Sequence, residues 1–175
     1  MDFLELAKAR QSCRAYDRSR PVEREKLLAC LEAARLAPSA CNSQPYHFTV
    51  AEGEMAHAVS ACTRGMGMNA FTENVRAFVI VNEEPYNWTA IAGSWYKGLD
   101  YRSADIGIAA AYFTAEADTQ GLSTCILGWF EEKKLQELLH IRRPIRLVIA
   151  VGYAVPGDPL RPKRRKSLEE LTTWM

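Results

Sequence analysis

The sequence predicts a single domain, residues 1–175, with an α+β or three-layer arrangement. Segments with helical and strand periodicity interleave along the chain, but they lack the strict strand–helix–strand alternation of a doubly wound sheet. The length of 175 residues suits one domain and does not comfortably make two. Hydrophobic residues make up 48% of the chain and charged residues 25%, which is ordinary for a globular protein with a sizeable core.

Two helices are expected before the first proline-rich loop. Asp2, with Glu5 three residues later, forms the pattern of a capping box and opens a short helix that runs to about Arg10. A second helix ends near Ala37, because Pro38 disfavours helical geometry in the residue before it. Its apolar residues at helical spacing are Leu27, Leu28, Leu31 and Ala34.

The next stretch is expected to hold a loop, two strands and a helix. Pro38–Pro45 contains two prolines, two serines and an asparagine, which is typical of a structured loop. Tyr46–Ala51 is expected to be a strand, and Met55–Asn69 a helix whose end is weakened by glycines. The β-branched run Phe78–Val81 is typical of a buried strand.

The C-terminal half begins with an aromatic-rich region, Glu83–Tyr101, to which we assign no element. After it we expect a helix over Arg102–Gln120, a strand over Ser123–Leu127, a helix over Glu131–Leu139 and a strand over Arg146–Ala154. The first of these helices carries an apolar, small-residue face suited to close packing: Ile106, Ala109, Ala110, Phe113 and Ala117.

The tail from Pro156 is expected to be extended as far as Ser167, because it carries three prolines and a basic run. Internal repeats and low-complexity linkers are absent from the sequence.

Charge, hydropathy and cysteine usage argue against several protein classes. The net charge of +1 gives no strong attraction to nucleic acid or to a membrane surface. No segment approaches the roughly 18 consecutive apolar residues of a membrane span. The first eight residues carry acids where a secretory signal carries bases, so we expect a cytoplasmic protein. Five scattered cysteines and three scattered histidines, without CxxC or HExxH, argue against disulfides and a metal site.

Two basic clusters could bind one anion. Arg10 and Arg14 flank Ser12 directly after the first helix, and residues 163–166 form a Lys-Arg-Arg-Lys run near the other end of the chain. A phosphate is best held by guanidinium groups together with a hydroxyl donor. Each cluster alone is better explained as a solvated surface.

An amide-rich loop and a glycine are further candidates for ligand binding. Asn42 and Gln44 each offer a donor and an acceptor, which suits the edge of a flavin ring or its ribityl hydroxyls. On these residues alone, a turn bonded only to its own backbone is the preferred interpretation. Gly128, at the end of an expected strand, allows backbone N–H groups to approach a ligand closely, or it simply makes a turn.

Motifs for other chemistry are absent from the sequence. It contains no GxGxxG after a strand, no GxxxxGK[ST] and no GxSxG. Dinucleotide-binding, P-loop and serine-hydrolase sites of these kinds are therefore not supported.

In this order and spacing, the motifs resemble the nitroreductase family from residue 1 to about residue 171. The sequence R-x-S-x-R closes the first helix, and E-A-A-R-L-A-P-S-x-x-N-S-Q-P precedes a strand. A-D-I-G follows at 104–107, G-L-S-T-C-I-L-G at 121–128 and P-K-R-R-K-S-L-E-E-L at 162–171.

The resemblance implies a nitroreductase-like three-layer fold with a central mixed sheet flanked by helices. It also implies an intertwined homodimer, with FMN bound at two interface sites. Members reduce FMN with NADH or NADPH and then reduce a small-molecule electron acceptor, such as a nitroaromatic or a quinone, in the same pocket. The small-residue helix face, centred on Ala109 and Ala110, is expected to pack in this dimer.

The resemblance also assigns roles to particular residues. Arg10 would hold the FMN phosphate, Ser12 a phosphate or ribityl oxygen, and Arg14 would lie near the pyrimidine edge. Asn69 would place an amide against the flavin ring, and Gly128 would present backbone N–H near the flavin N5.

The remaining implied positions come from the tail and from the partner subunit. Lys163 and Arg165 would complete the phosphate cage. The loop residues expected to reach the partner's flavin are Pro38, Ser39, Asn42 and Gln44. The 83–101 region, expected over the substrate face, matches no subgroup of the family.

Two alternatives to an NAD(P)H-dependent reductase remain open. The same fold could use FMN for another reaction, such as dehalogenation, dehydrogenation or flavin breakdown. A small non-enzymatic binding protein whose basic tail touches nucleic acid is the second, although the near-zero net charge argues against it.

Overall fold

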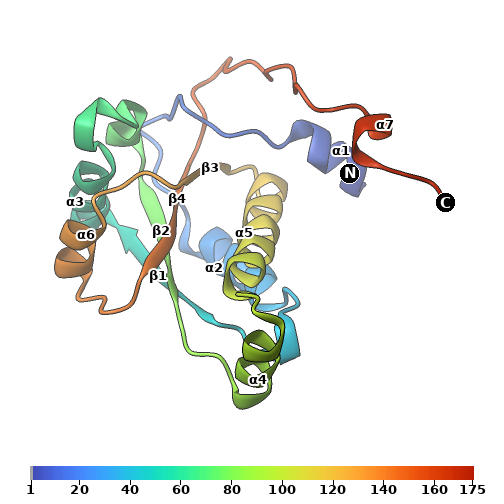
Figure 1. Cartoon of the computed structure of the whole chain (residues 1–175). Coiled ribbons are helices and arrows are strands. Elements are labelled where there is room, and N and C mark those ends of the chain that lie inside the picture. The colour runs from blue at the N-terminus through green and yellow to red at the C-terminus, as the bar shows by residue number, and fades with distance from the viewer. Residues whose placement is uncertain (1) are drawn as a thin grey trace.

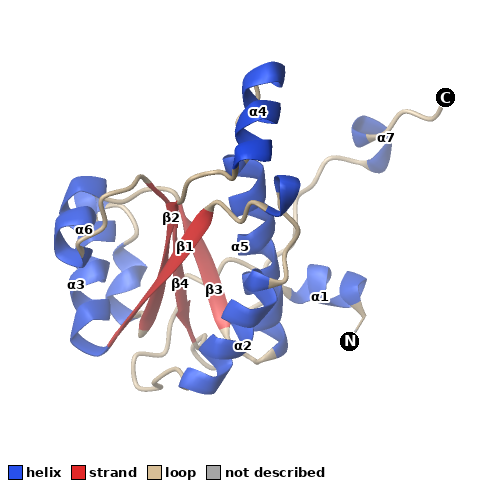
Figure 2. Ribbon diagram, turned by 90° about the horizontal axis from the view of Figure 1, so that it is seen from below, coloured by secondary structure: helices blue, strands red, loops and turns tan. Residues whose placement is uncertain are grey.

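The computed structural model, which describes residues 2–175, places a four-stranded sheet between two layers of helices (Figures 1 and 2). Helices α2 (Arg24–Arg35) and α5 (Arg102–Thr119) cover one face of the sheet. Helices α3 (Gly53–Thr63) and α6 (Glu132–Leu139) cover the other face. The predicted α+β, three-layer arrangement is confirmed.

The sheet has the strand order β1-β2-β4-β3, and its three strand pairings are all antiparallel. The strands are β1 (Tyr46–Glu52), β2 (Ala77–Glu83), β3 (Ser123–Leu127) and β4 (Ile145–Gly152). In register, Val79 of β2 pairs with Ile149 of β4, which in turn pairs with Ile126 of β3. Although a mixed sheet was expected, parallel pairing in the described chain is limited to an isolated bridge between Ser12 and Thr124.

The central strand β2 is buried along its whole length because helices cover both faces of the sheet. Phe78 and Ile80 pack in the core beneath α3 and α6, whereas Val79 and Val81 pack in the core beneath α2 and α5. This is the period-two alternation of a strand. Each such side chain contributes about 1.5–3 kcal/mol when fully buried, so a continuous apolar run specifies this central position.

The first helix begins and ends as predicted. Helix α1 (Phe3–Ala9) opens with a capping box, in which Asp2 accepts from the Glu5 backbone and Glu5 accepts from the Asp2 backbone. Arg10 closes the helix. The capping pattern was therefore sufficient to place this short helix.

The helix expected over Met55–Asn69 ends earlier, at Thr63, and that prediction was too long. Residues Gly65–Gly67 and Ala70–Asn74 form two separate 3₁₀ turns. Met66 and Asn69 adopt left-handed backbone angles, with φ of 57° and 52°, which no α-helix tolerates.

A helix absent from the sequence predictions, α4 (Trp88–Lys97), projects from the body of the fold (Figure 2). The Asn87 side chain caps its first turn, and Gly98, at φ 63°, ends it with a left-handed residue. The helix carries exposed aromatic side chains: Trp88, Trp95 and Tyr96.

The segment that carries α4 is fixed at its base by a buried carboxylate. Glu83 at the end of β2 accepts from Arg102 at 3.0 Å and from Arg146 at 2.8 Å. Arg102 also lies over the Tyr86 ring, 4.7 Å from its centroid. These contacts join the end of β2 to the start of α5, so the two ends of the intervening segment are held together.

The helix face expected to pack in a dimer is filled within the chain itself, which corrects that prediction. Ala109 and Ala110 are buried, and Ala110 belongs to the core beneath α2. Small residues that α5 leaves exposed or half-buried, among them Gly107, Ala111 and Ala115, line a hollow beside α1.

The tail is extended until Ser167, as predicted, and then forms the single-turn helix α7 (Leu168–Leu171). Ser167 and Glu170 make a second capping box. All five cysteines are free, and Cys41 alone among them is exposed. None of the helices described is both long and apolar enough to cross a membrane.

Candidate functional site

The segment after α1 and the proline-rich tail, far apart in sequence, lie against each other. Arg161 donates to the Ser12 carbonyl at 2.8 Å, and its backbone N–H donates to the Gln11 side chain at 3.0 Å. Gln11 also donates to the Pro159 carbonyl, and Lys163 donates to the Lys8 carbonyl. The fold therefore joins the two basic clusters, at contacts made by Gln11 and Arg161 that the sequence patterns did not single out.

Arg10 and Lys163 converge near one end of α5. Burial raises the pKa of Asp118, near the C-terminal end of that helix, while the positive charges of Arg10 and Lys163 act to lower it. Both cations are thus close enough to influence the same carboxyl group. Arg10 and Lys163 are two of the residues expected to bind a phosphate, and that role stays a prediction.

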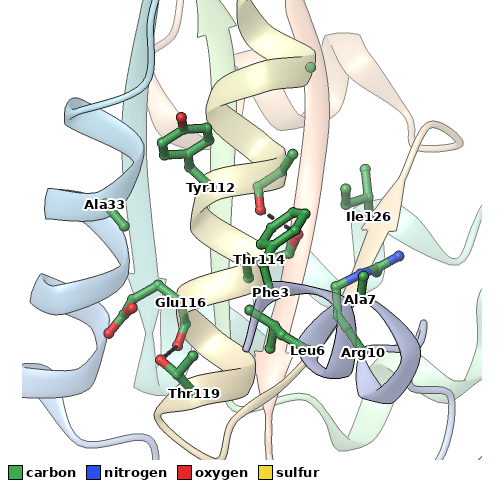
Figure 3. Close-up of a pocket in the computed structure, with 13 residues that line it drawn as sticks. Phe3, Leu6, Ala7, Arg10, Ala33, Tyr112, Thr114, Glu116, Thr119 and Ile126 are labelled. Carbon is green, nitrogen blue, oxygen red and sulfur yellow. Dashed lines mark hydrogen bonds between the residues drawn. The ribbon is translucent and has the colours of Figure 1, made fainter. Parts of the chain in front are cut away.

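Arg10 borders a hollow of about 610 Å³ between α1 and α5 (Figure 3). Phe3 and Leu6 of α1 form one side, and Tyr112 of α5 and Ile126 of β3 also line it. The lining is mostly apolar, with Arg10 as its single cationic residue. Pockets for small molecules and cofactors generally have this size and this pattern of an apolar lining with few polar groups.

Ser12 and Arg14 lie beside the first half of β3. Ser12 forms the parallel bridge with Thr124, and the Cys13 backbone donates to Thr124 at 2.9 Å. Burial raises the pKa of the neighbouring Cys125 thiol, against the charge of Arg14 and a hydrogen bond from Ser12. Both predicted residues therefore belong to the same region as Arg10.

Arg165 lies further out on the exposed tail. Its guanidinium donates to the carbonyl of the adjacent Arg164 at 2.8 Å, and the side chain is exposed. The structure thus brings Lys163, but not Arg165, into contact with the segment beside α1.

The Pro38–Pro45 loop is tightly wound. Cys41, Asn42 and Gln44 all have positive φ, between 46° and 50°, although none is glycine. Such residues persist only where surrounding contacts enforce them, and they concentrate at binding sites. Gln44 makes some of the contacts that hold these backbone angles. Its side chain donates to both oxygens of Asn42 at 3.1 Å, and its backbone donates to Ser39 Oγ at 3.0 Å.

Two residues outside the loop hold it in place. The buried carboxylate of Asp105, in the first turn of α5, accepts from the Ala40 backbone at 3.0 Å. Burial and the charge of Asp105 together raise the pKa of Tyr46, which follows the loop. Asn87 donates its side-chain amide to the Cys41 carbonyl at 2.8 Å. Asp105 belongs to the A-D-I-G motif at 104–107 that the resemblance rests on, but the motif alone assigned it no role.

Asn69 and Gly128 are brought together at the end of β3. The Asn69 amide donates to the Trp129 carbonyl at 3.0 Å and to the Thr63 carbonyl at 3.2 Å. Gly128 is exposed, and a Cβ placed there would meet open space. The Asn69 amide, which was predicted to face a ligand, therefore joins the end of α3 to Trp129, the residue that follows Gly128.

Within one chain, the two groups of predicted residues lie at opposite ends of α5. The loop with Ser39 and Asn42 is anchored at Asp105, whereas Arg10 and Lys163 lie near Asp118. Asp105 and Asp118 are thirteen residues apart on the same helix, which corresponds to about 20 Å at the rise of an α-helix. The anchor of the loop and the carboxyl group near Arg10 are therefore separated along α5.

The chemistry at the Arg10 end fits a phosphate. A guanidinium, an ammonium group and the Ser12 hydroxyl provide two positive charges and several donors, the combination that binds a phosphate dianion. Residues 2–175 contain no group of three or more His, Cys, Asp and Glu side chains arranged to hold a metal ion.

The sequence model of the nitroreductase family matches residues 7–86 and 67–153. An oxygen-insensitive NADPH nitroreductase of Helicobacter pylori is 27% identical over 212 aligned positions, which cover 100% of both chains. An iodotyrosine deiodinase of Thermotoga neapolitana is 24% identical, with 91% of this chain and 90% of the relative covered.

The fold also matches solved structures. A protein from Exiguobacterium sibiricum, described as a nitroreductase in complex with FMN, superimposes with a TM-score of 0.80 at 22% sequence identity. The match covers 100% of this chain and 98% of that one. The spatial arrangement of helices and strands is therefore shared over the whole chain.

Proposed function

This chain belongs to the nitroreductase family, and from that premise we propose that it is an FMN-dependent NAD(P)H oxidoreductase that reduces electron-poor acceptors such as nitroaromatics and quinones. The observation that carries the proposal is the contact between the two basic clusters: Lys163 donates to the carbonyl of Lys8, two residues before Arg10, and Arg161 donates to the Ser12 carbonyl. The names of its relatives, which include an NADPH nitroreductase and an FMN complex, support the same activity.

Each proposed binding residue has a role consistent with its position. Arg10, Lys163 and Ser12 would hold the FMN phosphate, and Arg14 would stabilise the negative charge that reduction places on the pyrimidine edge. Gly128 has no side chain and lies in open space, so its backbone could approach the flavin ring closely. Bound FMN would supply the hydride chemistry, and the chain would supply binding, orientation and exclusion of water.

The loop residues Ser39, Asn42 and Gln44 would complete the site from a second copy of the chain. The Asp105 anchor of this loop and Asp118, the carboxyl group near Arg10, are about 20 Å apart along α5, which supports an assembly in which each site draws on two subunits. The apolar hollow between α1 and α5 and the exposed apolar residues of α1, Phe3 and Leu4, offer surface for such a homodimer.

The test begins with the absorption spectrum of the purified protein after incubation with FMN and removal of free flavin. We expect bound flavin, followed by oxidation of NADH or NADPH that depends on an added quinone or nitroarene. A single pocket used in turn by both substrates should give parallel double-reciprocal plots. Failure to retain FMN would overturn the proposal, whereas intersecting plots would reject only the sequential use of one pocket.

A second candidate reaction is reductive dehalogenation, favoured by the similarity to an iodotyrosine deiodinase over 91% of the chain. The same assay separates the two candidates. Iodide release from iodotyrosine by the reduced protein, without turnover of quinones or nitroarenes, would favour dehalogenation over the activity proposed above.

A further inference from the structure

Asn87 hydrogen-bonds in two directions at once. Its Oδ1 accepts from the Ala90 backbone at 2.9 Å and thereby caps α4. Its Nδ2 donates to the Cys41 carbonyl at 2.8 Å, and its own backbone N–H donates to Ser43 Oγ at 2.8 Å. A single residue therefore joins the first turn of α4 to the wound loop at residues 41–43.

The two elements joined by Asn87 both have surfaces that the chain leaves open. Trp88 and Trp95 of α4 are each 86% exposed. Asn42 on the loop is exposed as well, although its backbone is held in the left-handed region. Open aromatic faces and enforced backbone angles side by side are features expected of a binding surface rather than of packing.

We propose that Asn87 is a positioning residue that fixes the Pro38–Pro45 loop relative to α4, so that the loop amides and the aromatic face of α4 meet the flavin and a planar acceptor in a defined geometry. The proposal rests on the function proposed above, since it assigns the loop to the flavin. It adds a residue outside the predicted site and gives the α4 segment a role in the same pocket.

The base of the α4 segment is already fixed by other contacts. Glu83 holds Arg102 and Arg146, and Tyr86 donates to Asp100 at 3.1 Å. These contacts close the stem of the segment but do not touch the loop. Besides the backbone bond from Glu84 to the Pro45 carbonyl at the end of the loop, the hydrogen bonds of Asn87 join this segment to residues 41–43.

An asparagine suits this place because both halves of its side-chain amide are used. A carboxylate caps a helix equally well and is favoured near a helix N-terminus. It cannot donate to the Cys41 carbonyl, and it would place a negative charge against that oxygen. Asn87→Asp thus preserves the cap of α4 while breaking the contact between α4 and the loop.

The experiment compares Asn87→Asp with a matched control, Thr89→Ala. Thr89 donates to Asn87 Oδ1 at 2.8 Å, so its removal alters the same cap but leaves the bond to Cys41 in place. Amide hydrogen exchange of the intact protein is measured without FMN and followed in the proteolytic fragment that covers residues 39–45. FMN affinity is measured separately by fluorescence titration. In Asn87→Asp we expect faster exchange and a rise in the FMN Kd of about 3- to 10-fold, the worth of one exposed hydrogen bond.

Each outcome decides a separate point. Unchanged exchange in Asn87→Asp would show that Asn87 does not hold the loop, and faster exchange with unchanged FMN affinity would show that it does not position the site. An equal effect of Thr89→Ala on both measurements would assign the change to the helix cap instead. Wild-type protein that binds no FMN would overturn the proposed function, whereas the exchange result would still report on the contact itself.

Discussion

Arg10 is positioned by the last turn of α1 and by the packing of the tail against residues 8–12. Its backbone N–H donates to the Leu6 carbonyl at 2.8 Å, which ends the helix at that point. The side chain borders the apolar hollow and acts, with Lys163, on the same carboxyl group, Asp118. Its role in phosphate binding can be tested independently of the remaining predicted site residues.

Replacement of Arg10 by alanine should weaken FMN binding about 10- to 150-fold, because a charge-assisted hydrogen bond contributes about 1.5–3 kcal/mol. Riboflavin lacks the phosphate, so its weaker affinity should be nearly the same in the variant and the wild type. Arg142→Ala, at an exposed arginine after α6, is the control for a general loss of positive charge. An Arg10→Ala protein that retains full FMN affinity would show that the phosphate lies elsewhere.

At this scale the sequence identified residue types better than residue contacts. The R-x-S-x-R motif and the terminal basic run predicted an anion site, and the fold brings Arg10, Ser12 and Lys163 into one region. Nothing in the run itself distinguished Lys163 from Arg165, because residues two apart on an extended backbone point to the same side, and the path of the tail decides which of them contacts the segment beside α1. Asn87 was likewise hidden, since its role depends on a contact 46 residues away.

Among the elements, those with a buried periodic face were predicted and those without one were not. The predicted bounds of β2 and α5 lie close to the observed ones, because the apolar residues of both elements face a core. Helix α4 was missed although Trp88, Ile91 and Trp95 repeat at helical spacing along it; this apolar stripe is exposed instead of packing on the core. The antiparallel pairing of the sheet also depends on the path of the connections, which periodicity does not encode.

Two glycines at strand ends provide an element-scale prediction. A Cβ at Gly152, at the end of β4, would lie 2.9 Å from the Tyr16 ring, and that ring is buried. Gly152→Ala should therefore lower the free energy of unfolding by about 1–3 kcal/mol. In thermal denaturation this corresponds to a fall in Tm of about 2–4 °C per kcal/mol for a chain of this size.

Gly128→Ala, just beyond β3, is the matched control because a Cβ there meets open space. We expect its Tm to equal that of the wild type. If Gly152→Ala were equally stable, Tyr16 would not be fixed where the structure places it. A loss of FMN affinity in Gly128→Ala at unchanged Tm would add support for a close approach of this backbone to the flavin.

For the whole molecule, the sequence predicted the layers correctly, whereas the division of the site between two subunits stays an implication of the family resemblance. The three-layer arrangement follows from alternating apolar segments of ordinary length. The distance between the loop and Arg10 does not follow from these segments, since it depends on which end of α5 each segment reaches. Ala109 and Ala110 illustrate the same limit, because a small-residue face packs equally well inside one chain or between two chains.

The position of the two half-sites at opposite ends of α5 has a genetic consequence. If each flavin is held by Arg10 of one subunit and Asn42 of the other, two inactive alleles should complement each other. In a mixed dimer of Arg10→Ala and Asn42→Ala chains, one site would carry both defects and the other would be intact. Coexpression with two affinity tags, followed by tandem purification, isolates that dimer. It should bind FMN at one tight site, whereas either parent binds it weakly at both. If the mixed dimer showed only the parental affinities, each site would have to be built within a single chain.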